Sequence, residues 1–136
     1  MKVLNNIISS LLSTSDKQYL LGTCYGLKTT YKTWNQAKAY CATLGGHLTK
    51  MDSEEKKDFI NSKMGHYTFW LGATDSASEG TWLWYDGTPV SWTYWNSGQP
   101  EQRTSSWDCM AWVGSWRRWR DLACTYDRYS VCSVKV

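Results

Sequence analysis

Residues 69–75, with the sequence Phe-Trp-Leu-Gly-Ala-Thr-Asp, mark the point at which the pattern of the chain changes. Beyond them, short aromatic segments alternate with Gly, Pro, Ser and Asn, which is typical of β-strands joined by turns. The segments predicted to be strands are Trp70-Leu71, Trp82-Leu83-Trp84, Cys109-Met110-Ala111-Trp112 and Tyr129-Ser130-Val131-Cys132. Residues 96–106 show no periodicity and are predicted to form a long loop, a feature that is usually functional in compact domains.

Two helices are predicted before these strands, and strand-like residues surround Cys24 and Tyr25 ahead of the helices. Thr33 is a suitable N-cap for the first helix, which stops at Gly45-Gly46. Ser53 begins the second helix, although Lys56 stands where a capping box has an acidic residue. Two helices followed by a run of strands indicate an α+β domain.

The N-terminal segment carries apolar residues at helical spacing and is predicted to form a short amphipathic helix. These residues are Val3, Leu4, Ile7, Ile8, Leu11 and Leu12. Lys2 and Ser13-Thr14-Ser15 also fit the two ends of a signal peptide, but two asparagines interrupt the apolar region that a signal peptide needs. We therefore assign residues 1–21 to an N-terminal helical extension, which packs on the domain or on a second chain. Residues 22–136 are assigned to a single domain.

Charge and composition exclude some classes of function. The 15 Lys and Arg residues and 12 Asp and Glu residues give a net charge of only +3, too little for a nucleic-acid-binding surface. No apolar run approaches 18 residues, so no membrane insertion is predicted. Ten Trp and nine Tyr accompany two Phe. Aromatic residues with a polar tip are favoured at interfaces, although any single Trp is more often a core residue.

The five cysteines, at positions 24, 41, 109, 124 and 132, lack a Cys-x-x-Cys pair, and the chain has only two histidines. Disulfides are therefore favoured over a zinc site, and they indicate secretion into an oxidising compartment. The spacing does not choose the pairs, and the odd number leaves one cysteine over.

Five motifs, in their order and spacing, resemble those of the C-type lectin domain family over residues 22–136. They are Trp70-Leu71-Gly72-Ala73-Thr74-Asp75, Trp82-Leu83-Trp84-Tyr85-Asp86-Gly87, Trp95-Asn96-Ser97-Gly98-Gln99-Pro100-Glu101, Trp107-Asp108-Cys109, and Trp119-Arg120-Asp121 with Cys124 and Cys132. The resemblance implies the C-type lectin fold, in which two helices flank short antiparallel sheets and disulfides hold the base of a long binding loop.

The resemblance also implies the cysteine pairs, which are Cys41 with Cys132 and Cys109 with Cys124. Cys24 then resembles one member of an N-terminal disulfide whose other member is absent here. Two interpretations remain open for it. If it is exposed, it forms a disulfide between two chains of a homodimer, to which the N-terminal helix also contributes; otherwise it is a buried thiol.

Sugar-binding members of the family hold a calcium ion that also accepts two sugar hydroxyls, which suits an ion with 6–8 oxygen ligands. Here Gln99-Pro100-Glu101 resembles the Gln-Pro-Asp form of the ligand tripeptide, which implies galactose or N-acetylhexosamine sugars. Trp107 replaces a ligating Glu and Arg120 a ligating Asn, so that Gln99, Glu101 and Asp121 remain. This set is poor for calcium, and we expect a sugar site whose calcium requirement is weak or absent.

In this sugar site Trp107 is expected to stack on the sugar ring. Arg120 is predicted to pair with Glu101 or Asp121 and to replace the charge of the ion. The alternative is that Arg120 points to solvent and that the site is lost.

Asp75, Glu79 and Asp108 resemble the ligands of a second calcium position of the family, although Trp107 and Gln102 stand where that position has acidic residues. A structural calcium and a solvated acidic loop both remain open there, so the implied cofactor is calcium or none.

No catalytic set is predicted, because neither His47 nor His66 has a nucleophile or a paired acid at motif spacing. The predicted function is therefore glycan binding without catalysis. The alternative is a lectin-like domain that binds protein, mineral or ice after losing its sugar site.

Overall fold

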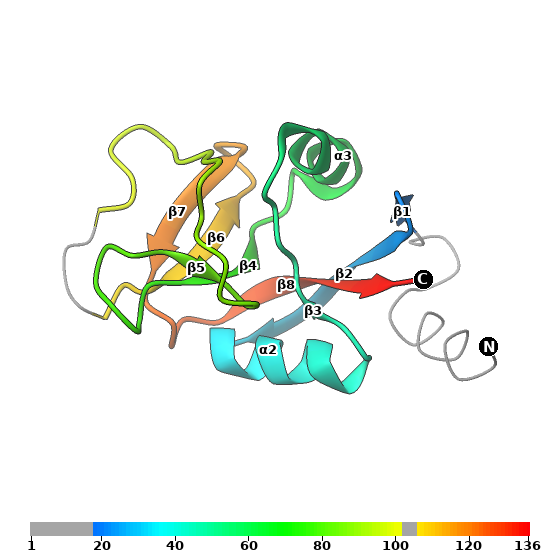
Figure 1. Cartoon of the computed structure of the whole chain (residues 1–136), viewed down its shortest axis with the longest axis horizontal. Helices are drawn as coiled ribbons and strands as arrows, with labels where there is room; N and C mark the ends of the chain where they lie inside the picture. Colours follow the sequence, from blue (N-terminus) through cyan, green and yellow to red (C-terminus); the bar gives the residue numbers. More distant parts are fainter. Residues whose placement is uncertain (1–17, 102–105) are drawn as a thin grey trace.

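The computed structural model describes residues 18–101 and 106–136, which form one sheet flanked by two helices (Figure 1). The predicted amphipathic helix and Gln102 lie outside the described residues. The strands are β1 (Gln18–Leu20), β2 (Thr23–Lys32), β3 (His47–Leu48), β4 (Phe69–Thr74), β5 (Leu83–Trp84), β6 (Cys109–Val113), β7 (Arg118–Leu122) and β8 (Arg128–Lys135). The helices are α2 (Trp34–Thr43) and α3 (Glu54–Met64). Neither described helix is long and apolar enough to cross a membrane.

Both predicted helix starts are confirmed. The Thr33 hydroxyl accepts a hydrogen bond from the Gln36 amide at 3.3 Å, and the Gln36 side chain accepts one from the Thr33 amide at 3.0 Å. The Ser53 hydroxyl accepts a hydrogen bond from the Lys56 amide at 3.2 Å. Lys56 itself cannot complete a capping box, and its ammonium lies 2.7 Å from Asp52.

The strands of the described chain follow the order β1-β2-β8-β4-β6-β7, with β3 paired to β8 and β5 paired to β4. Most pairs are antiparallel as expected, but β4 and β8 run parallel. Strands β1, β3 and β7 were not predicted. β1 falls within the expected N-terminal extension, and its pairing with β2 brings residues 18–20 into the sheet.

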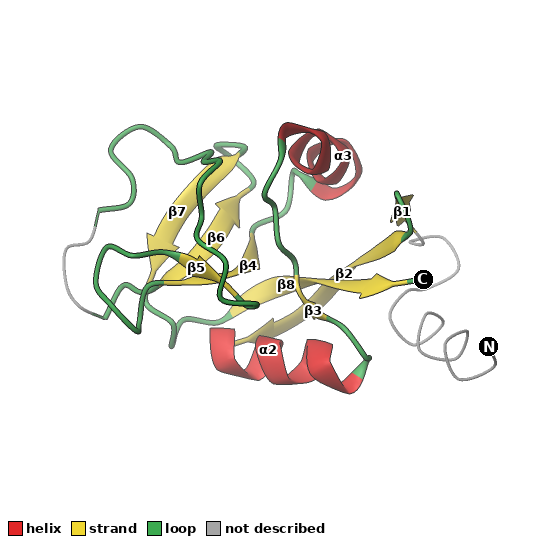
Figure 2. Cartoon of the chain, in the orientation of Figure 1, coloured by secondary structure: helices red, strands yellow, loops and turns green. Residues whose placement is uncertain are grey.

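The two helices lie on opposite sides of the β2–β8 pair (Figure 2) and bury separate parts of the core. Trp34, Ala37 and Cys41 of α2 pack in one part, and Ile60 and Met64 of α3 in the other. Residues of β4 contribute to both parts of the core, because successive side chains of a strand point to opposite faces. The core therefore fixes the strands that carry the loop between β5 and β6.

Two disulfides hold this frame. Cys41 of α2 bonds to Cys132 of β8, and Cys109 at the start of β6 bonds to Cys124 after β7. These are the pairs that the family resemblance implies. Cys24 takes part in neither disulfide and is 0% exposed. Its burial corrects the interchain interpretation, because a bridge to a second chain requires an accessible sulfur.

Candidate functional site

The described part of the segment between β5 and β6 lies at the end of the molecule opposite β1 and the C-terminus (Figure 1). Strand β7 holds this part in place. The Asn96 amide donates to the Trp119 carbonyl at 2.9 Å, and the Gln99 amide donates to the Asn96 carbonyl at 2.9 Å. The Glu101 amide donates to Oδ1 of Asp121 at 3.0 Å. The Gln99–Pro100 peptide bond is cis. These bonds bring the predicted ligand tripeptide to the edge of β7.

The side chains of Asp121 and Arg120 point to opposite faces of β7. Asp121 is 0% exposed and its carboxylate holds the Glu101 amide. Arg120 is half-buried on the other face, since neighbouring residues of a strand alternate. Its Nε donates to the backbone carbonyl of Asp121 at 3.0 Å.

The predicted pairing of Arg120 with Glu101 or Asp121 is corrected by this arrangement. Among the described residues the ion pairs are formed by Lys50, Lys56 and Lys57, and none involves Arg120. The alternation of the strand explains the difference for Asp121, whose carboxylate points away from the guanidinium. The alternative, an Arg120 side chain that simply points to solvent, is also not what the structure contains.

Two indole rings hold the Arg120 guanidinium. Its Cζ atom lies 5.4 Å from the ring centroid of Trp107 and 5.5 Å from that of Trp116, both within cation–π distance. Trp107 is half-buried, while Trp116 is 39% exposed in the turn between β6 and β7. We call Trp107, Arg120 and Trp116 the indole–guanidinium cluster. Nothing in the spacing of Trp116 in the sequence indicates that it reaches Arg120.

The donor set around the tripeptide does not suit calcium. Oδ1 of Asp121 already accepts the Glu101 amide, and the Arg120 cation lies beside the same strand edge. Oε1 of Gln99 is buried and, within the described chain, has no hydrogen-bond partner. Trp107 and Arg120 stand at two of the family's ligand positions, and the three remaining side chains, Gln99, Glu101 and Asp121, fall short of the 6–8 oxygen ligands that calcium takes.

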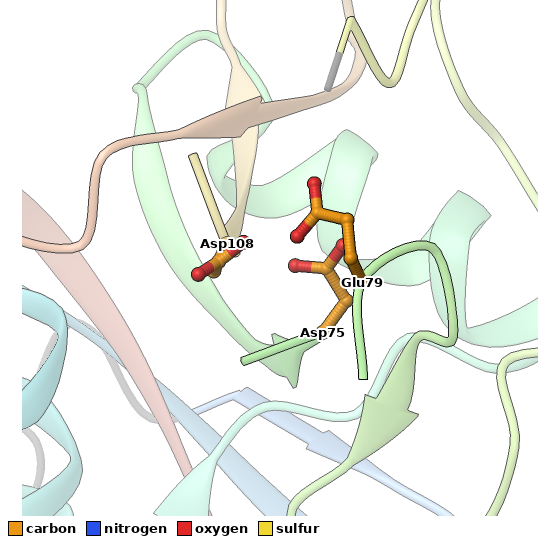
Figure 3. Close-up of side chains that lie close together, drawn as sticks. All are labelled: Asp75, Glu79 and Asp108. Atoms are coloured by element: carbon orange, nitrogen blue, oxygen red, sulfur yellow. The ribbon is translucent and has the colours of Figure 1, made fainter. Parts of the chain in front are cut away.

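A second cluster joins Asp75 after β4, Glu79 in the following turn and Asp108 before β6. One oxygen from each carboxylate lies within 4.8 Å of the others, and the three side chains point toward one another (Figure 3). Backbone contacts fix the cluster, because the Asp75 amide donates to the Asp108 carbonyl at 3.1 Å. The Gly80 amide donates to Oδ2 of Asp75 at 2.9 Å.

The electrostatics of this cluster favour a bound cation. Burial raises the pKa of Asp75 to about 6, although the hydrogen bond from the Gly80 amide lowers it, and the Asp108 carboxylate adds to the rise. Burial also raises the pKa of Asp108, and the neighbouring Glu79 carboxylate raises it further. Oδ1 of Asp75 and Oδ1 of Asp108 are buried without a hydrogen-bond partner in the described chain. Asp75 is only 1% exposed while Glu79 is exposed, and these oxygen donors fit calcium.

The family model of the Lectin C-type domain matches residues 30–134. The chain belongs to the C-type lectin family. This lectin domain is 38% identical over 117 residues to the hepatic lectin of Gallus gallus, a match that covers 85% of the chain and 56% of that protein. The chain thus spans about half the length of this relative.

Solved structures share the fold of the lectin domain. The carbohydrate-recognition domain of the mouse scavenger receptor C-type lectin superposes with a TM-score of 0.82 at 27% identity, covering 90% of this chain and 95% of that one. A calcium-independent type II antifreeze protein superposes with a TM-score of 0.80 at 28% identity, covering 92% and 95%.

Proposed function

We propose that this lectin domain binds a glycan of the galactose or N-acetylhexosamine type at Gln99, Glu101, Trp107, Arg120 and Asp121. One observation carries the proposal. The half-buried indole of Trp107 lies against Arg120, and Asp121, the neighbour of Arg120 on β7, fixes the tripeptide through the Glu101 amide. An indole face suits the apolar face of a sugar ring, and a few fixed polar groups supply orientation. The half-buried Arg120 guanidinium is one such group, because its Nε is fixed by a hydrogen bond to the Asp121 carbonyl.

Calcium is assigned a supporting role in this proposal. Asp75, Glu79 and Asp108 would hold the ion, which would neutralise three neighbouring carboxylates and tie the turn after β4 to the start of β6. Asp108 directly follows Trp107 in the chain, so this cluster braces the C-terminal end of the sugar loop. Arg120 supplies the fixed positive charge at the sugar site itself, and no calcium ion is needed between protein and sugar.

Replacing Asp75 with asparagine should weaken calcium binding roughly tenfold or more, because affinity at oxygen sites follows the number of charged ligands. Isothermal titration with calcium, or terbium luminescence sensitised by tryptophan, measures the change. Asp86→Asn is the matched control, since Asp86 pairs with Lys50 at 2.9 Å outside the cluster. Equal affinities of Asp75→Asn and the unmodified domain would remove calcium from this cluster.

Replacing Trp107 with alanine should weaken glycan binding about thirtyfold or more, the scale expected for an aromatic residue at the centre of a binding site. Inhibition by free galactose and N-acetylgalactosamine of binding to an immobilised glycan provides the measurement. Tyr31→Ala is the control, because Tyr31 is 68% exposed on β2 and is not part of the site. The site is placed wrongly if Trp107→Ala binds as tightly as the unmodified domain.

We propose extracellular placement on the strength of the two disulfides, which persist in oxidising compartments. Whether the protein is secreted or held at a cell surface depends on the sequence context of the domain. A homodimer through the N-terminal segment stays a prediction.

A further inference from the structure

We propose that the glycan recognised at this site carries an acidic group, a carboxylate or a sulfate ester, which pairs with the guanidinium of Arg120. The inference rests on the proposed function and names the class of sugar that the site takes.

The guanidinium of Arg120 is held in a fixed position. Its Nε donates to the Asp121 carbonyl at 3.0 Å, and its Cζ lies over the indoles of Trp107 and Trp116. The terminal nitrogens of this side chain make no hydrogen bond to the described residues. A planar guanidinium that is fixed at one edge presents its other donors in the paired geometry that carboxylates and sulfates accept.

Among residues 18–101 and 106–136, Arg120 forms no ion pair. In the described ranges, every ion pair belongs to a lysine, and no carboxylate lies within ion-pair distance of Arg120. The side chain is also half-buried between aromatic rings, where a charge without a partner is costly. An anion supplied by the ligand would remove that cost.

The charged residues next to Arg120 form contacts with other groups. Nη1 of Arg117 donates to Oδ1 of Asn61 at 2.8 Å, and Cζ of Arg118 lies 4.2 Å from the Tyr94 ring centroid. Asp121 turns its carboxylate to the Glu101 amide on the opposite face of the strand. Of the three arginines near β7, Arg120 is the one held by Trp107, the residue proposed to stack on the sugar.

The fixed cation of Arg120 therefore lies next to the indole of Trp107, the surface proposed to stack on the sugar. A sugar ring on Trp107 brings its substituents toward Arg120, since the two side chains are in contact. A guanidinium binds an anionic oxygen pair more strongly than neutral hydroxyls, because the pair accepts two parallel hydrogen bonds and adds the attraction between opposite charges. The site therefore discriminates between acidic and neutral forms of the same sugar.

The test compares three galactosides in the presence of chelator: the neutral methyl galactoside, its 3-O-sulfated form and its 3-O-sialylated form. At least one acidic form should bind about ten- to hundredfold more tightly than the neutral form, the range expected for hydrogen bonds to a charged group. This preference should decrease as salt is added. The derivative that gains affinity shows whether the group is a sulfate or a carboxylate.

Variants at Arg120 separate charge recognition from a structural role. Arg120→Gln should reduce the acidic-to-neutral affinity ratio to about one, and Arg120→Lys should retain only part of it, because lysine keeps the charge without the paired donors. Arg117→Gln, which alters an arginine bound to Asn61, should retain the ratio.

Two outcomes overturn the inference while the proposed function stands. In the first, the unmodified domain binds the neutral galactoside as tightly as both acidic ones. In the second, Arg120→Gln lowers all three affinities equally and keeps their ratio. If no galactoside binds at all, the inference and the proposed function fail together.

Discussion

Replacing Cys41 and Cys132 with serine should lower the free energy of unfolding by about 4 to 5 kcal/mol, if the disulfide acts by restricting the unfolded chain. The two residues are 91 positions apart, so the bond closes most of the domain into one loop. It also ties α2 to β8, the strand on which β2, β3 and β4 all pair. The loss should therefore be global and should appear as a lower midpoint in urea, monitored by tryptophan fluorescence.

The pair Cys109 and Cys124 provides the comparison, because these residues are only 15 positions apart. Replacing both with serine should cost about 3 kcal/mol by the same reasoning. A larger loss for the Cys109–Cys124 variant than for the Cys41–Cys132 variant would contradict this order and would place the main effect in the native state.

Replacing Trp119 with alanine should lower the free energy of unfolding by about 3–5 kcal/mol, the cost of deleting a large aromatic side chain from a core. Trp119 is 0% exposed, and its ring meets those of Trp84, Trp92 and Trp95 edge to face at centroid distances of 5.9, 5.8 and 5.4 Å. Its indole Nε1 lies 3.2 Å from the sulfur of Met51. A cavity at this point would leave several rings without a packing partner.

Trp116→Ala is the matched control for Trp119→Ala, because Trp116 is 39% exposed in the adjacent turn. It should cost less than about 1 kcal/mol, as is usual for substitutions near the surface. Urea unfolding of both variants measures the difference. Equal losses would show that Trp119 is not the centre of this aromatic core.

Local residue patterns predicted the helices well because their signals are local. Thr33 and Ser53 cap helices through bonds to residues three positions away, which the sequence displays directly. Strand β7 was missed for the opposite reason. Its residues Arg118-Trp119-Arg120-Asp121-Leu122 include three charged side chains, and the buried Asp121 accepts a hydrogen bond from the distant Glu101 amide.

The candidate site shows the same division. The family spacing brought Asp75, Glu79 and Asp108 together correctly, although 33 positions separate the first from the last. The family's ligand positions suggested that Arg120 pairs with Glu101 or Asp121, but Arg120 and Asp121 are neighbours on a strand and their side chains point to opposite faces. The contact between Arg120 and Trp116 depends on the geometry of a turn, which no local pattern describes.

We propose that the domain binds sugar at the β7 edge without a calcium ion between protein and ligand. Hapten inhibition of glycan binding, measured in calcium and again in chelator, tests it most directly on the unmodified domain and on Asp75→Asn. We expect both proteins to retain binding in chelator. Binding by Asp75→Asn that disappears in chelator and returns with calcium would contradict the claim, because the ion would then lie in the sugar loop itself.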